Sequence, residues 1–209
     1  LLLVAVGITA CTQNNTKEAT LKNLTKNPVI TFHADQLIIQ GMTEKDTMFI
    51  ASSDNYVFRK DEKAELLNGY QMYKEASYHH PYFNVDVVTH NYYDGDSMVH
   101  DVYAPMEVSR MVKQKANLKR RDFEFAEGSL ITMLQILESH GFITVREKDT
   151  VVNNTRYYYI DALPENDTIR HELLIDKKQN LPYFMRITTN TFQPFIEEYI
   201  YSSFAYPES

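Results

Sequence analysis

Stretches rich in β-branched and aromatic residues alternate with short polar clusters along most of the chain, a pattern typical of antiparallel sheets. The clearest case is the run from Val151 to Thr189, where residues 155–163, 171–176 and 183–189 are predicted strands separated by two polar turns. Apolar side chains stand at both odd and even positions of these strands. We therefore expect both faces of this part of the sheet to be covered, or one face to curve around something apolar.

Further strands are predicted before and after this run. They are residues 27–40 with an interruption near 33–35, two short strands within 47–59, and residues 83–91, 98–103, 142–146 and 195–204. Residues 61–76 are predicted as a helix, although Asn68-Gly69 within them is also a hairpin signal. Residues 105–126 are predicted to be partly helical.

The clearest helix covers residues 130–140, which Ser129 can cap and Gly141 can close. Its apolar stripe recurs with the spacing i, i+3, i+4, i+7 and consists of Leu130, Met133, Leu134 and Leu137. We expect this helix to pack against the concave side of the sheet. The predicted class is thus α+β, with one domain dominated by an antiparallel sheet.

The first eleven residues indicate a compartment. Leu1 to Ala10 is an apolar run too short to span a bilayer, and we interpret it as the end of a secretory signal. It closes on Ile8-Thr9-Ala10-Cys11, which resembles the lipobox of bacterial lipoproteins, where the cysteine is lipidated and becomes the mature N-terminus. We therefore expect residues 1–11 to be a signal-peptide remnant, 12–26 a polar tether and 27–209 a single domain. The tether would hold that domain on the periplasmic side of an envelope membrane, such as the outer membrane.

Composition narrows the possible function classes. A chain that is 44% hydrophobic and 23% charged is typical of a globular domain, and its net charge of −7 argues against nucleic-acid binding, which needs a basic face. The single cysteine excludes an internal disulfide in this stretch. No two of the seven histidines have the helical i, i+4 spacing of a zinc site, and the Gly-x-Ser-x-Gly elbow of a hydrolase is missing. We therefore expect no enzyme activity, no catalytic residue, no metal and no cofactor.

The run from Asp149 to Ile187 resembles the carboxy-terminal half of the LolA/RseB-like superfamily of periplasmic lipid-handling proteins. In that family a strand ends in Ile-Asp, a polar turn follows, and Leu-Pro opens the next strand; here residues 174–182 read LIDKKQNLP. An aromatic strand segment precedes this motif, as Tyr157 to Ile160 do here. Where the family usually has glycine, this chain has Asn154 and Asn180, and asparagine tolerates the left-handed conformation.

The resemblance implies a curved, incomplete antiparallel β-barrel of the LolA-like kind, with helices packed on its concave face. It also implies a non-catalytic envelope lipoprotein that binds an acyl chain, another lipid or a lipoprotein segment in the hollow. The expected ligand-lining residues are Tyr157, Tyr159, Leu173, Ile175, Phe184, Met133 and Leu137. The alternative is an accessory interaction domain of a larger envelope protein, such as one that precedes a thioredoxin-like domain. The expected partners are a hydrophobic ligand, the membrane through lipidated Cys11, and, under the alternative, a protein of the envelope.

Overall fold

The structure of the protein is a computed structural model. It describes residues 17–40, 47–61, 69–81, 83–93, 97–104, 107–115, 133, 143–145, 150–162, 169–189 and 195–208. Within these residues no helix is long and apolar enough to cross a membrane.

Twelve strands of the described residues form one antiparallel sheet. Their bounds are β1 (Val29–Gln40), β2 (Met48–Lys60), β3 (Tyr70–His80), β4 (Val85–Tyr93), β5 (Ser97–Ala104), β6 (Glu107–Lys115), β7 (Ile143–Val145), β8 (Thr150–Val152), β9 (Thr155–Ala162), β10 (Ile169–Asp176), β11 (Pro182–Thr189) and β12 (Phe195–Ala205). Their order is β6-β5-β4-β3-β2-β1-β12-β11-β10-β9-β7, with β8 paired to β9. Most strands therefore pair with their neighbours in sequence, and the last strand returns to lie beside the first.

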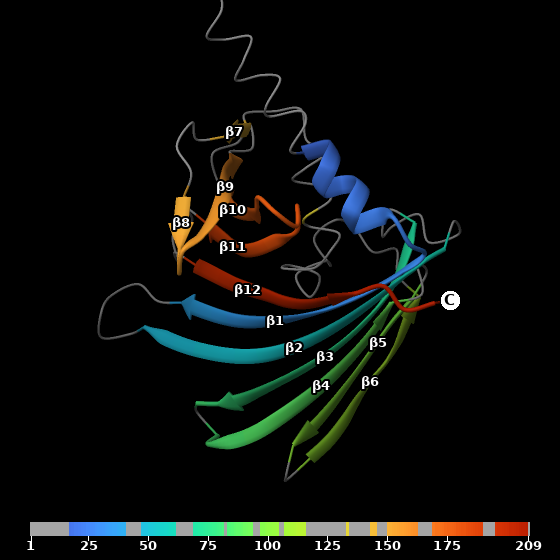
Figure 1. The fold of residues 1–209 in the computed structure, drawn as a ribbon. Coiled ribbons are helices and arrows are strands. Elements are labelled where there is room, and N and C mark those ends of the chain that lie inside the picture. The colour runs from blue at the N-terminus through green and yellow to red at the C-terminus, as the bar shows by residue number, and fades with distance from the viewer. Residues whose placement is uncertain are drawn as a thin grey trace, which may run out of the picture.

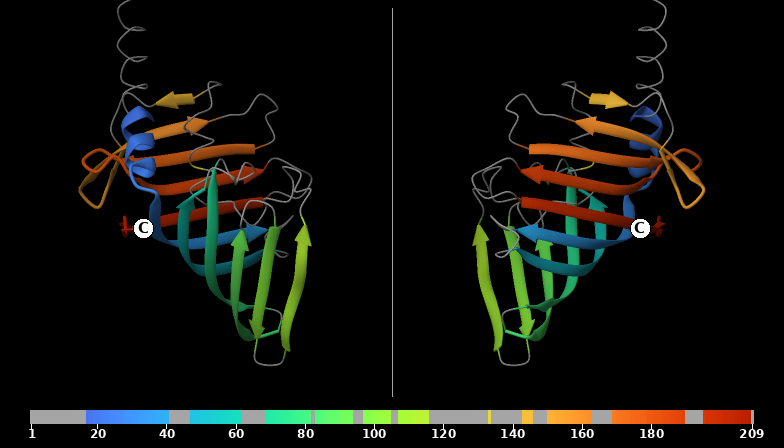
Figure 2. Two further views of the ribbon diagram at one scale, coloured as in Figure 1. Left: turned by 90° about the vertical axis from the view of Figure 1, so that its right-hand side faces the viewer. Right: turned by 90° about the vertical axis from the view of Figure 1, so that its left-hand side faces the viewer.

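The sheet is open and strongly curved (Figure 1). Seen from the side, β9–β12 and β1 run across the picture whereas β4–β6 run steeply along it, so the strand direction turns through the sheet (Figure 2). Twist accumulates in this way because each strand is rotated relative to its neighbour. The end strands, β6 and β7, are not paired with each other in the described part of the chain. This is the curved, incomplete antiparallel barrel that the sequence predicted.

Alternate residues of the long strands point to one face of the sheet, which we call the inner face. On β1 the buried residues are Ile30, Phe32, Ala34 and Gln36, and the residues between them are partly or fully exposed, as the two-residue period of a strand requires. The main core cluster lies on this face and consists of Leu24, Ile30, Phe32, Ala34, Tyr56, Phe58, Tyr70, Met72, Tyr93, Met133, Ile160, Ala162, Leu173, Ile175, Met185, Ile187, Tyr199 and Tyr201. Residues from both ends of the chain thus share one core.

The opposite face, which we call the outer face, carries a second and smaller apolar cluster. Tyr157, Tyr159 and Leu174 form it, and the partly buried Tyr183 and Phe184 pack against it. The rings of Tyr157 and Tyr183 are stacked with their centroids 4.7 Å apart. The central strands therefore have apolar side chains on both faces, as their lack of strict alternation predicted.

The turn between β10 and β11 has the geometry that the sequence motif indicated. One carboxylate oxygen of Asp176 accepts hydrogen bonds from the backbone N–H groups of Lys178 and Gln179, both at 2.7 Å. Asn180 adopts a φ of 51° and donates its N–H to the carbonyl of Asp176 at 2.8 Å. Asn154 likewise has a φ of 64°. Asparagine therefore fills both left-handed positions, as its tolerance of this conformation allows.

Four predicted elements are corrected by the structure. β1 is continuous through residues 33–35, β2 is one strand rather than two, and residues 70–76 and 107–115 are strands rather than helices. In β3 the buried residues Tyr70, Met72 and Ala76 alternate with partly buried ones. This two-residue period prevailed over the helical spacing that we inferred from the same apolar residues.

The amino-terminal boundary of the domain also moves. Residues 17–25, within the predicted tether, form a helix whose Leu24 is fully buried in the main core cluster. Asn23 donates its side-chain amide to the carbonyl of Gln179 at 2.7 Å, and the hydroxyl of Tyr206 donates to the carbonyl of Asn23 at 2.8 Å. The two buried residues of this segment, Thr20 and Leu24, are four positions apart, a helical spacing that the polar composition of the segment concealed. Residues 17–25 therefore pack with the sheet.

The predicted helix over residues 130–140 lies outside the described residues, apart from Met133. That residue is helical and fully buried in the main core cluster. The lipobox residues and the signal-peptide remnant also lie outside the described residues.

Candidate functional site

The predicted ligand-lining residues do not share one surface. Leu173, Ile175 and Met133 belong to the main core cluster on the inner face, whereas Tyr157, Tyr159 and Phe184 lie on the outer face. The pairing register explains the split, because Leu173 stands opposite Ile160 and Leu174 stands opposite Tyr159. Odd-numbered residues of β9 thus share a face with even-numbered residues of β10. Leu137 and Cys11 lie outside the described residues.

The inner face presents a large apolar surface that several distant segments build together. Strands β1–β4 contribute one side of it and β9–β12 the other, while the helix of residues 17–25 lies over the end of the sheet near the chain terminus (Figure 1). Phe32 stacks on Tyr56 and on Phe58, with ring centroids 4.9 and 5.8 Å away. Met72, Met133 and Met185 are each fully buried in the same cluster. Large rings and flexible thioethers together make up this buried apolar cluster.

A band of polar side chains interrupts this apolar surface. Its centre is an ion pair in which Lys74 Nζ lies 2.6 Å from Asp54 Oδ2. The hydroxyl of Tyr56 donates to the same carboxylate oxygen at 3.2 Å, and Lys74 also lies over the Tyr56 ring. Asp54 is fully buried and Lys74 is 8% exposed. A charged pair so far from water is uncommon in a domain core.

The band continues on β12 and β1 through a chain of hydrogen bonds. The hydroxyl of Tyr199 donates to Glu197 and accepts a hydrogen bond from Gln36 Nε2 at 2.8 Å. Ser52 in turn donates its hydroxyl to Gln36 Oε1 at 3.0 Å. Glu197, like Asp54, is buried. The charged residues that are buried in the described part of the chain are therefore Asp54, Lys74 and Glu197.

The electrostatics of the band keep its tyrosines protonated. Burial is the main cause that raises the pKa of Tyr56, Tyr199 and Tyr201 well above the usual value. The charge of Asp54 raises the pKa of Tyr56 further, and the charge of Glu197 does so for Tyr199 and Tyr201. The hydroxyls of Tyr56 and Tyr199 therefore act as hydrogen-bond donors toward Asp54 and Glu197 throughout the physiological pH range.

Little in the sequence indicated this band of buried polar residues. Asp54 and Lys74 stand at inward positions of predicted or missed strands, where an apolar residue is the usual choice. Asp54 falls in the polar run Ser52 to Asn55, which we interpreted as a break between two strands. Only the observed register shows that this run stays in the ladder and that its acidic residue points inward.

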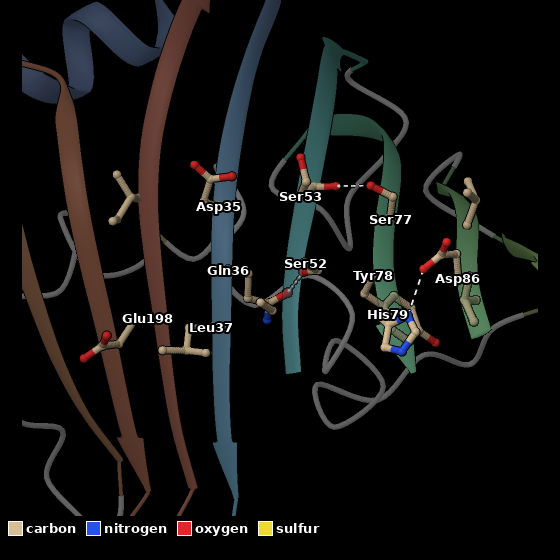
Figure 3. A pocket seen from close by; sticks show the side chains of 14 residues that line it. Asp35, Gln36, Leu37, Ser52, Ser53, Ser77, Tyr78, His79, Asp86 and Glu198 are labelled. Atoms are coloured by element: carbon tan, nitrogen blue, oxygen red, sulfur yellow. Dashed lines mark hydrogen bonds and ion pairs between the residues drawn. The ribbon is translucent and has the colours of Figure 1, made fainter. Parts of the chain in front are cut away.

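The outer face has a hollow of about 690 Å³ over β12, β1, β2, β3 and β4. Its lining includes the small residues Ala51, Ser53 and Ser77. Asp35, Asp86 and Glu198 contribute carboxylates to the lining (Figure 3). The sequence reasoning did not identify this hollow. Most of the residues that line it occupy the outward positions of ordinary two-residue alternation along each strand, a pattern that does not distinguish a hollow from any other exposed face.

Two histidines near the hollow are held by acidic or amide neighbours. His79 Nδ1 lies 2.9 Å from Asp86 Oδ1, and this hydrogen bond is the main cause that raises the pKa of His79 (Figure 3). His33 has a raised pKa, first because of its hydrogen bond to Asn55 and then because of Asp35. Across the described residues, no group of three or more His, Cys, Asp or Glu side chains could hold a metal ion.

Comparison with known proteins gives similarity to solved structures only, because no family model and no curated protein matches the sequence. LprF from Mycobacterium bovis is 8% identical over 93% of this chain and 95% of its own, with a TM-score of 0.46. A LolA superfamily protein from Nitrosomonas europaea is 9% identical over 93% of each chain, with a TM-score of 0.34. A DUF1329 family protein from Desulfovibrio piger is 12% identical over 92% of each chain, with a TM-score of 0.38. At such identities and TM-scores, the function has to be argued from the residues of this chain.

Proposed function

We propose that the protein is a lipid-anchored lipoprotein of a bacterial envelope that binds an apolar ligand against the inner face of its half-barrel. The ligand would be an acyl chain, another lipid or a lipoprotein segment, and the protein would perform no catalysis on it. The observation that carries the proposal is the inner face itself, where rings and thioethers from both halves of an open sheet form one apolar surface.

The energetics of apolar burial favour such a role. Each buried methylene contributes about 0.8 kcal/mol, so an acyl chain with about ten buried methylenes would gain about 8 kcal/mol. Side chains such as Met72 and Met185 can adopt several rotamers around chains of different shape. Of the predicted lining residues, Leu173, Ile175 and Met133 lie on this face, and we keep these three in the proposed site.

The test uses N-phenyl-1-naphthylamine, an uncharged dye that fluoresces in apolar surroundings, and delipidated full-length protein carrying Cys11→Ala to prevent lipidation. We expect saturable dye binding that Met133→Glu or Leu173→Glu abolishes. The matched control is Ile200→Glu on the outer face, where Ile200 is 44% exposed, and it should bind the dye as the parent does. Absence of saturable binding, together with no co-purified lipid in native mass spectrometry, would exclude the proposal.

The anchor has a separate test, because Cys11 and the residues around it are known from sequence alone. When the protein is expressed with a complete signal, palmitate should label it and it should sediment with membranes. Cys11→Ala should prevent both. An unlabelled parent protein would rule out the anchor and leave the ligand site untouched.

The hollow of the outer face supports a second candidate, an accessory interaction domain of a larger envelope protein. Its volume of about 690 Å³ and the exposure of Ile200 beside it give a partner a surface to contact. This candidate predicts that the parent protein does not bind the dye and that Ile200→Glu disrupts the assembly with the partner. The ligand-binding candidate predicts that the parent protein and Ile200→Glu both bind the dye. Dye binding by these two proteins therefore distinguishes the candidates.

A further inference from the structure

The hollow of the outer face follows from a change in side-chain size across the sheet. One row of cross-strand neighbours runs from Ile200 on β12 through Asp35, Ser53 and Ser77 to Val88 on β4. Serine side chains are shorter than those at the two ends of the row, so β2 and β3 form a floor between higher sides. Figure 3 shows Asp35, Ser53 and Ser77 on three adjacent strands of this row.

The sides of the hollow are partly apolar. Leu37 lies beside Glu198 on β12 and beside Ala51 on β2, so the floor continues into the next row. Ile200, on the same side, is 44% exposed. A volume of about 690 Å³ is in the usual range of a binding pocket, and exposed apolar groups with a polar rim are typical of contact surfaces.

The charged groups of the lining have one sign at neutral imidazole. Among the described residues that line the hollow, Asp35, Asp86 and Glu198 carry carboxylates, and none is a lysine or an arginine. Glu198 has its cation on the neighbouring strand β11, where Arg186 Nη2 lies 2.6 Å from Glu198 Oε1. The two aspartates have a different kind of partner.

Asp35 forms its ion pair with a histidine. His33 Nε2 lies 3.2 Å from Asp35 Oδ1, and His33 Nδ1 lies 3.0 Å from Oδ1 of Asn55 on β2. The charge of Asp54 on β2 also acts on His33, and the neighbour on β12 is the uncharged Ser202. Only imidazolium can donate to an oxygen from both ring nitrogens. The hydrogen bonds to Asn55 and Asp35 accordingly raise the pKa of His33.

Asp86 has a histidine partner of the same kind. His79 Nδ1 lies 2.9 Å from Asp86 Oδ1 on β4, and His79 Nε2 lies 3.2 Å from Oδ1 of Asn84 in the β3–β4 turn. These hydrogen bonds raise the pKa of His79, with Asp86 as the larger cause, and the lining residues of β2 are uncharged. Both aspartates are therefore compensated only while the two histidines are protonated.

We propose that the outer-face hollow binds a cationic segment of a partner protein, with lysine or arginine side chains toward Asp35 and Asp86. An apolar side chain of the same segment lies on the floor against Leu37, Ile200 and Val88. Charge complementarity selects this occupant. A second copy of the chain docked through the same face would bring carboxylate against carboxylate. The inference rests on the interaction role suggested for this hollow, whose partner chemistry it names, and it is independent of the inner-face ligand site.

The histidines make this binding depend on pH. When they are protonated, they occupy the two aspartates and repel an incoming cation. When they are neutral, a lysine or arginine of the partner can take their place. Binding should therefore strengthen as the pH rises, and a bound segment should make both imidazoles easier to deprotonate.

The experiment measures the fluorescence anisotropy of labelled octapeptides with full-length protein carrying Cys11→Ala. The probe alternates lysine with leucine, and two control peptides alternate serine or glutamate with leucine. We expect saturable binding of the lysine peptide, binding of the serine peptide that is about tenfold weaker, and none of the glutamate peptide. The affinity of the lysine peptide should fall with added salt, and also from about pH 8 to about pH 5.5.

A pair of double variants tests the carboxylates. Asp35→Asn/Asp86→Asn removes two negative charges from the hollow and should weaken binding of the lysine peptide about tenfold. Glu18→Gln/Glu208→Gln removes the same charge from exposed residues that do not line the hollow, and it should bind the peptide as the parent does. If the aspartate variant does not fold, Ser77→Arg carries the test, because it places a cation on the floor and should abolish binding.

The histidines have a variant of their own. His33→Gln/His79→Gln keeps both aspartates but removes the groups that compensate them at low pH. Its affinity for the lysine peptide should change little between about pH 5.5 and about pH 8, in contrast to the parent. A parent protein whose affinity is the same at both pH values would overturn the part of the inference that assigns the compensation to the histidines.

The remaining outcomes distinguish this inference from the functions proposed above. Equal losses in the aspartate variant and its control would overturn the site, because net charge alone would then attract the peptide. Equal binding of the serine peptide would overturn the cationic partner and leave the hollow as a docking surface. Displacement of the lysine peptide by excess N-phenyl-1-naphthylamine would place it on the inner face and overturn the inference. Absence of peptide binding would overturn it too, and dye binding would still decide the ligand site.

Discussion

The buried ion pair gives the sharpest stability prediction. Lys74→Met removes the ammonium 2.6 Å from a carboxylate that has no exposed surface, while keeping most of the volume of the side chain. At a charge separation of about 4 Å the pair interacts by about 4 kcal/mol when the effective dielectric constant is about 20. The variant leaves Asp54 buried and uncompensated, so we expect a loss of about 3 to 5 kcal/mol in the free energy of unfolding.

The double variant Asp54→Leu/Lys74→Met supplies the comparison. Replacing a buried pair by apolar residues also removes the desolvation penalty, so its stability should return to within about 1 kcal/mol of the parent or exceed it. Urea unfolding followed by circular dichroism measures both values, and an unchanged slope shows that the same unfolding reaction is compared. A loss below about 1 kcal/mol in Lys74→Met alone would refute the reasoning, because surface ion pairs contribute about that much.

Two other predictions concern local features of the sheet. In the β10–β11 turn, Asp176→Ala removes the acceptor of two backbone N–H groups and should lower the free energy of unfolding by about 1 to 2 kcal/mol. Asn180→Gly should be nearly neutral, because Asn180 has a φ of 51° and glycine adopts this left-handed conformation without strain. Burial lowers the pKa of His171 to about 4, so the folded state favours the neutral imidazole. Above the unfolded pKa of about 6.5, His171 is neutral in both states and does not reduce the free energy of unfolding. As the pH falls from about 6.5 toward 4, the unfolded state takes up the proton first, and the free energy of unfolding should decrease by about 3 kcal/mol. His171→Gln should flatten the acid limb of the stability profile, and an NMR titration with a midpoint near 6.5 in the folded protein would contradict the burial argument.

The sequence was most informative where a local signal and the tertiary structure agree. The motif from Leu174 to Pro182 predicted two strands and their turn, and the observed hydrogen bonds of Asp176 and Asn180 follow from the chemistry of those side chains. It was least informative about which face a residue occupies. The run of Tyr157, Tyr158, Tyr159 and Ile160 is apolar at both parities, so only the pairing register assigns its members to the inner or the outer face.

The missed features share a physical cause, which is that burial of a polar group depends on its partner. Asp54 indicated a turn by itself, because an isolated carboxylate belongs near water. Lys74 indicated an exposed position for the same reason. Each becomes compatible with the inner face only through the other, and the two residues are 20 positions apart on strands whose register no local pattern specifies. Helix residues 17–25 show the same dependence, since Asn23 finds its partner at Gln179.

The stability cycle separates two reasons for keeping the buried pair. Replacing a buried ion pair by apolar residues of similar volume is often neutral or stabilising, so a core that only holds the sheet together has little to gain from Asp54 and Lys74. If the double variant Asp54→Leu/Lys74→Met is as stable as the parent, the pair is not retained for the stability of the fold. If the double variant is much less stable than the parent, the pair stabilises the fold directly, and the polar band belongs to the architecture of the curved sheet.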